Sequence, residues 1–83
     1  MDRQDIAERV RAALAKGLGV DTGAVTPEAR FDEDLDADSL DLVEAALAVE
    51  EDLGVKIEDE EMRDIRTVGD AVNLVASKLD VTV

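Results

Sequence analysis

Apolar residues spaced three to four positions apart are the feature of this 83-residue sequence that most restricts its fold. In the first segment this spacing is kept by Ile6, Val10 and Leu14. The period matches the turn of an amphipathic helix, so we predict a helix over residues 2–18. Gly17 or Gly19 is suited to the end of this helix, where a left-handed backbone conformation is often needed.

Further helical segments are predicted by the same criteria. Residues 39–53 form the best-defined helix, with Asp38 as N-cap and Asp41 in the capping-box position. Residues 59–63 are expected to form one short helical turn, and a last helix is expected to begin at Thr67. The buried face of that last helix is expected to be Val68, Ala71, Val72, Val75 and Leu79.

Residues 19–38 show no sustained period, and a structureless loop of that length is uncommon in a small domain. We interpret the segment as an ordered connection, pinned by Val20, Val25, Phe31 and Leu35. Residues 80–83 are expected to be frayed. The predicted fold is all-α: a small three-to-four-helix bundle with a long ordered loop between helices one and two, in a single domain over residues 1–83.

Composition argues against catalysis and against a metal site. The sequence contains no His, Cys, Tyr or Trp, so most of the usual nucleophiles and general bases are missing, and we expect no catalytic residue. The acidic run of residues 32–38 resembles a calcium loop, but the register fails. Ala37 stands where the tight-turn Gly is needed and Val43 where the bidentate Glu belongs, so no metal site is expected.

The net charge of −13 is concentrated in one part of the chain. Residues 28–64 hold 16 acidic and 3 basic residues, whereas acids and bases balance in the rest. Such a field favours basic protein surfaces as partners and disfavours nucleic acid. The polar start lacks a signal peptide, and the longest apolar run, residues 45–49, is too short to span a membrane. We therefore expect a cytoplasmic monomer without membrane contact.

The start of the second helix contains the one side chain suited to carry a modification. Serine at a helix start most often acts as an N-cap, but Asp38 is already suited to that role, which leaves the Ser39 hydroxyl without a local duty. A phosphate ester at Ser39 would lie at the positive end of the helix dipole. These arguments indicate a phosphate-bearing serine, and a phosphoserine would fit them equally well.

Asp38-Ser39-Leu40-Asp41 is one of several segments that resemble type II acyl carrier proteins. The others are Phe31 to Leu35, Glu50 to Val55, Ile57 to Glu61 and Thr67-Val68, with the spacing preserved over nearly the whole chain. The resemblance implies that Ser39, flanked by Asp38 and Leu40, carries 4′-phosphopantetheine derived from coenzyme A. Acyl groups would then be held on this arm as thioesters. Two positions depart from the family pattern: Asp36 stands where Gly is usual, and Glu58 where Pro is common.

The apolar residues of the second helix form two stripes, of which one is sufficient for the core. The core stripe is expected to be Leu42, Ala46, Val49 and Leu53. The other stripe, with its acidic border, is the expected partner-docking surface: Asp38, Leu40, Asp41, Val43, Glu44, Leu47, Glu50 and Glu51. An acyl-sheltering cavity is expected to be bordered by Ala46, Val49, Met62 and Ile65.

The resemblance implies two groups of partners: a phosphopantetheinyl transferase, and ketosynthase, acyltransferase, reductase and dehydratase enzymes with basic docking patches. Fatty-acid and polyketide biosynthesis, or another specialised pathway, are all compatible with the sequence. The alternative from a different functional class is a small acidic helical interaction module without a covalent arm.

Overall fold

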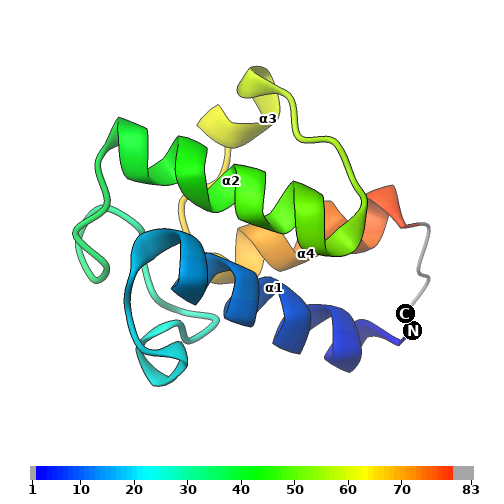
Figure 1. Ribbon diagram of the computed structural model, residues 1–83, viewed down its shortest axis with the longest axis horizontal. Helices are drawn as coiled ribbons and strands as arrows, with labels where there is room; N and C mark the ends of the chain where they lie inside the picture. Colours follow the sequence, from blue (N-terminus) through cyan, green and yellow to red (C-terminus); the bar gives the residue numbers. More distant parts are fainter. Residues whose placement is uncertain (1, 80–83) are drawn as a thin grey trace.

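Four α-helices form the described part of the chain, residues 2–79 of the computed structural model. They are α1 (Arg3–Leu18), α2 (Ser39–Leu53), α3 (Asp59–Arg63) and α4 (Val68–Lys78), with a short 3₁₀ turn, η1, at Thr22–Ala24. α1 packs against both α2 and α4, and the short α3 lies on the opposite side of these two helices from α1 (Figure 1). The predicted all-α helical bundle is confirmed, whereas the prediction for residues 80–83 lies outside the described residues.

The helix boundaries follow from local capping. Asp2 accepts a hydrogen bond from the Asp5 N–H at 2.9 Å and begins α1, and Gly19 ends it in the left-handed conformation, with φ of 70°. Thr67, the predicted start of the last helix, is the N-cap of α4 and forms a capping box with Asp70. The predicted bounds of α2 and α3 match the observed ones, because each helix end has its own capping residue. Within residues 2–79, no helix is both long and apolar enough to cross a membrane.

The buried face of α2 agrees with the predicted core stripe at Val49 and Leu53 but not at Leu42 and Ala46. Ala45, Val49 and Leu53 are buried, whereas Leu42 and Ala46 are half-buried. The reason is a close approach of two helices: a Cβ placed on Gly17 would lie only 2.7 Å from the Ala45 Cα. α1 therefore covers α2 at position 45, and positions 42 and 46 face the space between α2, α3 and α4.

The long connection between α1 and α2 is ordered and packed, as the sequence predicts. Its buried apolar residues are Val25, Ala29, Phe31 and Leu35. The Arg11 Nε donates to the Val25 carbonyl at 2.6 Å and ties the connection to α1. A short antiparallel bridge pairs Arg30 with Thr67 at the start of α4. These contacts fix the path by which the chain reaches Asp38 and the start of α2.

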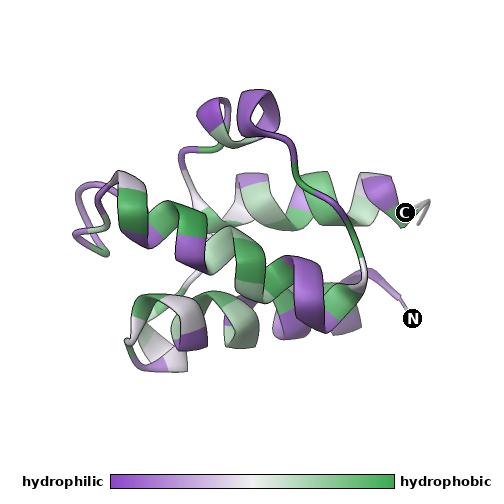
Figure 2. Ribbon diagram, turned by 45° about the horizontal axis from the view of Figure 1, so that its top comes forward, coloured by the Kyte–Doolittle hydropathy of each residue, from purple (hydrophilic) through white to green (hydrophobic). Residues whose placement is uncertain are grey.

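Hydropathy is distributed unevenly among the helices. Figure 2 shows hydrophobic residues along α2 and α4, and mostly hydrophilic ones on α3. α3 has no fully buried residue, so it is the least anchored of the four helices.

Candidate functional site

The start of α2 presents Ser39 to solvent. The Asp38 Oδ1 accepts a hydrogen bond from the Asp41 N–H at 2.9 Å, and the Asp41 Oδ2 accepts one from the Asp38 N–H at 3.2 Å. This capping box satisfies the helix start without the Ser39 hydroxyl. Ser39 is the first residue of α2 and is exposed, next to Leu40, which is 66% exposed.

These residues fit a phosphate ester that carries a long arm. The phosphate would lie at the N-terminal end of a 15-residue helix, where backbone dipoles favour negative charge. The arm would leave from an exposed position into solvent. Both neighbouring carboxylates are held in the capping box, so neither is placed to act as a base toward the Ser39 hydroxyl.

Asp36, two residues before the cap, has a φ of 52°. A left-handed backbone costs an ordinary residue about 1–2 kcal/mol, and Asp tolerates it better than most. This conformation explains in physical terms why Gly suits the position. Asp36 is exposed, so its side chain does not offset the strain by burial.

We expect Asp36→Val to destabilise the protein by about 1–2 kcal/mol relative to Asp36→Gly, because a β-branched residue is strongly disfavoured at positive φ. Both variants remove the same charge, so their difference isolates the backbone effect. Urea unfolding of the two variants measures it. Equal midpoints and slopes would mean that the loop relaxes out of the left-handed conformation at no cost.

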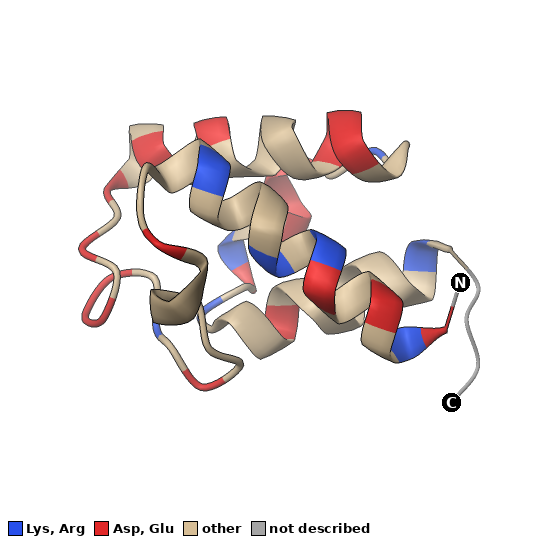
Figure 3. Cartoon of the chain, turned by 60° about the horizontal axis from the view of Figure 1, so that its bottom comes forward, with Lys and Arg blue, Asp and Glu red and all other residues tan. Residues whose placement is uncertain are grey.

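The predicted docking stripe is exposed on α2. Leu40, Val43 and Leu47 are the large apolar residues exposed among those described, at 66%, 44% and 51%. α2 contains no Lys or Arg, and Figure 3 shows acidic bands along it and in the preceding loop. Asp38, Glu44 and Glu51 are exposed around the stripe, whereas Asp41 is half-buried in the capping box.

Glu50 lies differently from the other residues predicted for docking. It is half-buried, and its Oε2 accepts a hydrogen bond from the Ile57 backbone N–H at 2.7 Å. Its carboxylate is therefore directed into the connection between α2 and α3. Glu50 and Glu51 are adjacent identical residues in the sequence. No local pattern indicates that the Glu50 carboxylate accepts a backbone hydrogen bond while the Glu51 side chain is exposed.

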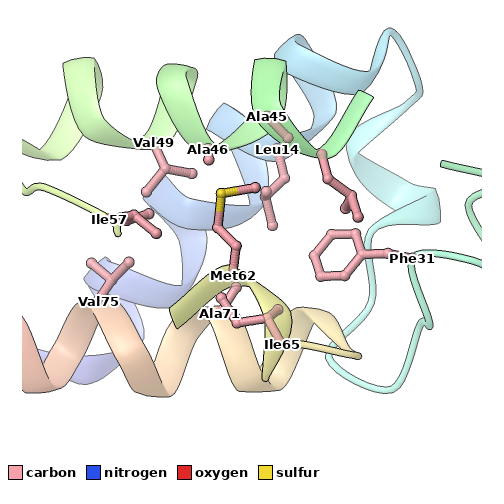
Figure 4. Close-up of a pocket in the computed structure, with 11 residues that line it drawn as sticks. Leu14, Phe31, Ala45, Ala46, Val49, Ile57, Met62, Ile65, Ala71 and Val75 are labelled. Carbon is pink, nitrogen blue, oxygen red and sulfur yellow. The ribbon is translucent and has the colours of Figure 1, made fainter. Parts of the chain in front are cut away.

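An apolar cavity of about 40 Å³ lies between α2, α3 and α4 (Figure 4). All four residues predicted to border a cavity line it, and the full lining is Leu14, Phe31, Leu42, Ala45, Ala46, Val49, Ile57, Met62, Ile65, Ala71 and Val75. One water molecule needs about 10–15 Å³ of such volume, so the cavity has room for only a few small groups. A longer apolar guest would enter only if a wall moves.

The wall with the fewest anchors is α3, which contributes Met62, and Ile65 follows two residues after its end. Its Glu61 Oε1 lies 2.8 Å from the Lys78 Nζ in the last turn of α4. The hydrogen bond from Lys78 lowers the pKa of Glu61, and the Glu58 backbone N–H lowers it further. This ion pair and two half-buried apolar side chains hold α3 against the cavity.

Acid should destabilise the fold, because some of its carboxylates accept backbone hydrogen bonds in the folded state. Asp70 accepts hydrogen bonds from the backbone N–H groups of Arg66 and Thr67, at 3.0 and 3.2 Å, and these bonds lower the pKa of Asp70. The pKa of Asp32 is lowered by the Glu33 backbone N–H. A carboxyl with a lower pKa in the folded state adds stability above its unfolded value, near 3.9 for Asp, and that stability is lost as pH falls through the folded value.

We therefore expect the free energy of unfolding to fall as the pH is lowered below about 4. Asp70→Asn keeps an oxygen acceptor for the two N–H groups and removes the titration, so its stability should depend less on pH in this window. Urea unfolding between pH 7 and pH 3 compares the two proteins. Parallel curves would show that the cap of α4 does not contribute to acid sensitivity.

Comparison with known proteins bears directly on this site. Residues 8–75 match the family described as "Phosphopantetheine attachment site", and this range includes Ser39. The match covers α2 and α3 entirely and most of α1 and α4.

Three similar proteins are each named "Acyl carrier protein". The one from Rubrobacter xylanophilus is 52% identical over 75 residues, which are 90% of this chain and 93% of the relative. The one from Petrotoga mobilis is 46% identical over 98% of this chain and 95% of the relative. The one from Thermosynechococcus vestitus is 47% identical over 95% of this chain and 98% of the relative.

Proposed function

This chain belongs to the acyl carrier protein family, and on that premise we propose that Ser39 is the attachment point of its prosthetic group. Family membership implies a covalently attached 4′-phosphopantetheine and a role as a carrier in acyl-chain biosynthesis rather than as a catalyst. It also implies interaction with synthase enzymes and with a phosphopantetheinyl transferase. The alternative of an interaction module without a covalent arm is therefore set aside.

One observation supports Ser39 above all. Its hydroxyl is exposed at the first position of α2, while Asp38 and Asp41 already satisfy the helix start. When bound, the group supplies a thiol that holds an acyl chain as a thioester. The residues of this chain would orient the ester: the backbone N–H groups of the first turn of α2 would face the phosphate, and Leu40, exposed next to Ser39, would lie beside it.

The test is an intact mass measurement before and after incubation with coenzyme A and a broad-specificity phosphopantetheinyl transferase. We expect a gain of one phosphopantetheine unit, which peptide fragmentation should locate on Ser39. No gain, from protein that is folded and unmodified at the start, would overturn the assignment. A gain located on Ser77 would refute Ser39 while leaving the carrier function intact.

We further propose that Leu40, Val43 and Leu47, with their acidic border, form the docking surface for partner enzymes. The partners proposed are ketosynthase, acyltransferase, reductase and dehydratase enzymes that present basic patches. Exposed charges at the rim of an interface mainly raise association rates, while an apolar centre supplies contact. Such a surface suits transient binding, because a carrier must leave each enzyme in turn.

Glu44→Lys should slow association with a basic partner by about tenfold at low salt, because it reverses an exposed charge at the border of the stripe. Stopped-flow or surface-based binding to one such enzyme measures the rate at several salt concentrations. Glu8→Lys makes the same charge change at an exposed position of α1, away from the proposed docking surface, and is the control. Equal slowing by both variants would mean that total charge, rather than this surface, determines the rate.

The cavity bordered by Ala46, Val49, Met62 and Ile65 is the proposed shelter for the acyl chain. Leaving a methylene group in water instead of burying it costs about 0.8 kcal/mol, so a medium-length chain has a strong tendency to enter. The small unloaded volume, about 40 Å³, indicates that α3 must move outward to admit it. Side-chain NMR shifts at these residues should differ between the acyl-loaded and unloaded forms, and identical shifts would contradict the proposal.

The remaining expectations from the sequence stand as parts of the same proposal. The chain is proposed to act as a cytoplasmic monomer and as one carrier domain over residues 1–83. Its cargo is proposed to be an intermediate of fatty-acid or polyketide biosynthesis. The apolar lining of the cavity supports a hydrocarbon cargo over a polar one.

A further inference from the structure

The connection between α2 and α3 is held by one side-chain hydrogen bond that the carrier chemistry does not require. The Ile57 backbone N–H donates to the Glu50 Oε2 at 2.7 Å, across seven residues of sequence. Glu50 is half-buried in the last two turns of α2, and Ile57 is half-buried in the connection. Hydrogen bonds to an ionised acceptor are roughly twice as strong as neutral ones, so this contact is a strong local restraint.

The restrained residue closes one end of the cavity. Figure 4 shows Ile57 next to Val49 and above Val75, whereas Phe31 lies at the opposite end, toward the start of α2. An acyl chain held on an arm attached at Ser39, and entering from the start of α2, would meet Phe31 first and Ile57 last. Ile57 forms the far wall of the proposed shelter.

The length of the cavity along α2 sets a scale for the chain. Leu42 and Val49 both line it and are seven residues apart, which corresponds to about 10 Å along the helix axis. Carbon–carbon bonds of about 1.5 Å advance a zigzag chain by about 1.25 Å each, so about eight carbons cover that length. Chains much shorter than this do not reach Ile57, and chains near this length do.

We propose that Glu50 is a positioning residue that fixes Ile57 as the far wall and thereby determines how long an acyl chain the protein shelters. This inference rests on the proposed function of the cavity. Without the carboxylate, the Ile57 N–H pairs with water, the connection between Gly54 and Glu58 loosens, and the last carbons of a long chain lose their apolar contact. Short chains, which end before Ile57, are unaffected.

The first experiment uses the unloaded protein and measures hydrogen exchange of the Ile57 amide. In Glu50→Ala we expect exchange to be faster by about tenfold or more, because the only partner of this N–H among the described residues is removed. Glu50→Gln keeps an oxygen acceptor and should stay within about threefold of the wild type. Glu51→Ala removes the same charge from the exposed neighbour and should exchange like the wild type.

The second experiment measures the rise in melting temperature on loading acetyl, butanoyl, hexanoyl and octanoyl groups. For acetyl and butanoyl, Glu50→Ala should show the same rise as the wild type. For octanoyl, its rise should fall to less than half, and Glu50→Gln should restore it. A loss equal at all lengths would assign Glu50 a purely structural role, and an equal loss in Glu51→Ala would assign the effect to charge. Either result overturns the proposal.

Two features keep the test decisive. If Glu50→Ala fails to fold, Ile57→Ala truncates the same wall and must show the same length-dependent loss, while Glu50→Gln must keep the wild-type rise. If the protein takes up no phosphopantetheine, no acyl series exists and the proposed function fails, yet the Ile57 exchange rates still report whether Glu50 holds the connection. An unchanged Ile57 exchange rate in folded Glu50→Ala rejects the positioning role on its own.

Discussion

Ser39→Ala is expected to abolish attachment of phosphopantetheine completely while leaving the fold intact. The variant removes the hydroxyl to which the ester must form, so the loss should be total rather than partial. Its free energy of unfolding should stay within about 0.5 kcal/mol of the wild type, because the capping box is made by Asp38 and Asp41 and Ala suits a helical position. Intact mass after incubation with coenzyme A and a transferase, together with urea unfolding, measures both effects.

Two variants make this result specific. Ser77→Ala removes the other serine of the sequence, which is exposed on α4, and should still gain one unit. Asp38→Ala keeps the Ser39 hydroxyl but removes the cap, and should cost about 1 kcal/mol of stability. A mass gain in Ser39→Ala would refute the assigned site. A collapse of its stability would instead show that the Ser39 side chain supports the helix start.

Local capping explains why the helix bounds were predictable from sequence. Asp38 and Gly54 bracket α2, and Thr67 begins α4, each through hydrogen bonds or backbone conformations that involve only neighbouring residues. Such interactions depend on sequence a few positions away and on nothing else. The same is true of the exposure of Ser39, which follows from Asp38 having taken the capping role.

The exposed stripe was predictable for a different reason. A helix at the surface of a small bundle buries one apolar face, so a second stripe, here Leu40, Val43 and Leu47, must remain outside. Which face of α2 is buried was harder to predict from the sequence. Ala45 is buried and Ala46 only half-buried, because α1 approaches α2 at Gly17, and periodicity within α2 carries no information about that approach.

The lining of the cavity and the contact of Glu50 could not be predicted fully from the sequence, because both depend on segments that are far apart in the chain. Phe31 from the long connection and Val75 from α4 line the same cavity as Met62 from α3, and no local pattern brings these three together. Glu50 was expected on the docking surface with Glu51, but its carboxylate bonds to the Ile57 N–H. Glu51, its neighbour in sequence, has the same side chain and charge, so only the fold separates their roles.

Gly17→Ala is expected to destabilise the protein, although helix propensity alone predicts the opposite. Gly17 lies inside α1, where Ala in place of Gly normally gains about 1 kcal/mol. Here the new Cβ would lie 2.7 Å from the Ala45 Cα and 3.2 Å from the Ala45 N, and backbone atoms cannot rotate away as side chains do. Overpacking of this kind costs about 1–3 kcal/mol, so the helices must separate and a net loss results.

Gly23→Ala provides the matched control, since a Cβ at Gly23 meets no atom within 4 Å and its φ is not positive. That variant should gain about 0.4–1 kcal/mol by restricting the unfolded chain. The two substitutions are chemically identical, so opposite signs in urea unfolding would isolate the contact between α1 and α2. A stabilised Gly17→Ala would mean that α1 and α2 move apart at little cost. In that case, the close approach of the two helices would not explain why Ala45 is buried in the core while Ala46 is only half-buried and faces the cavity.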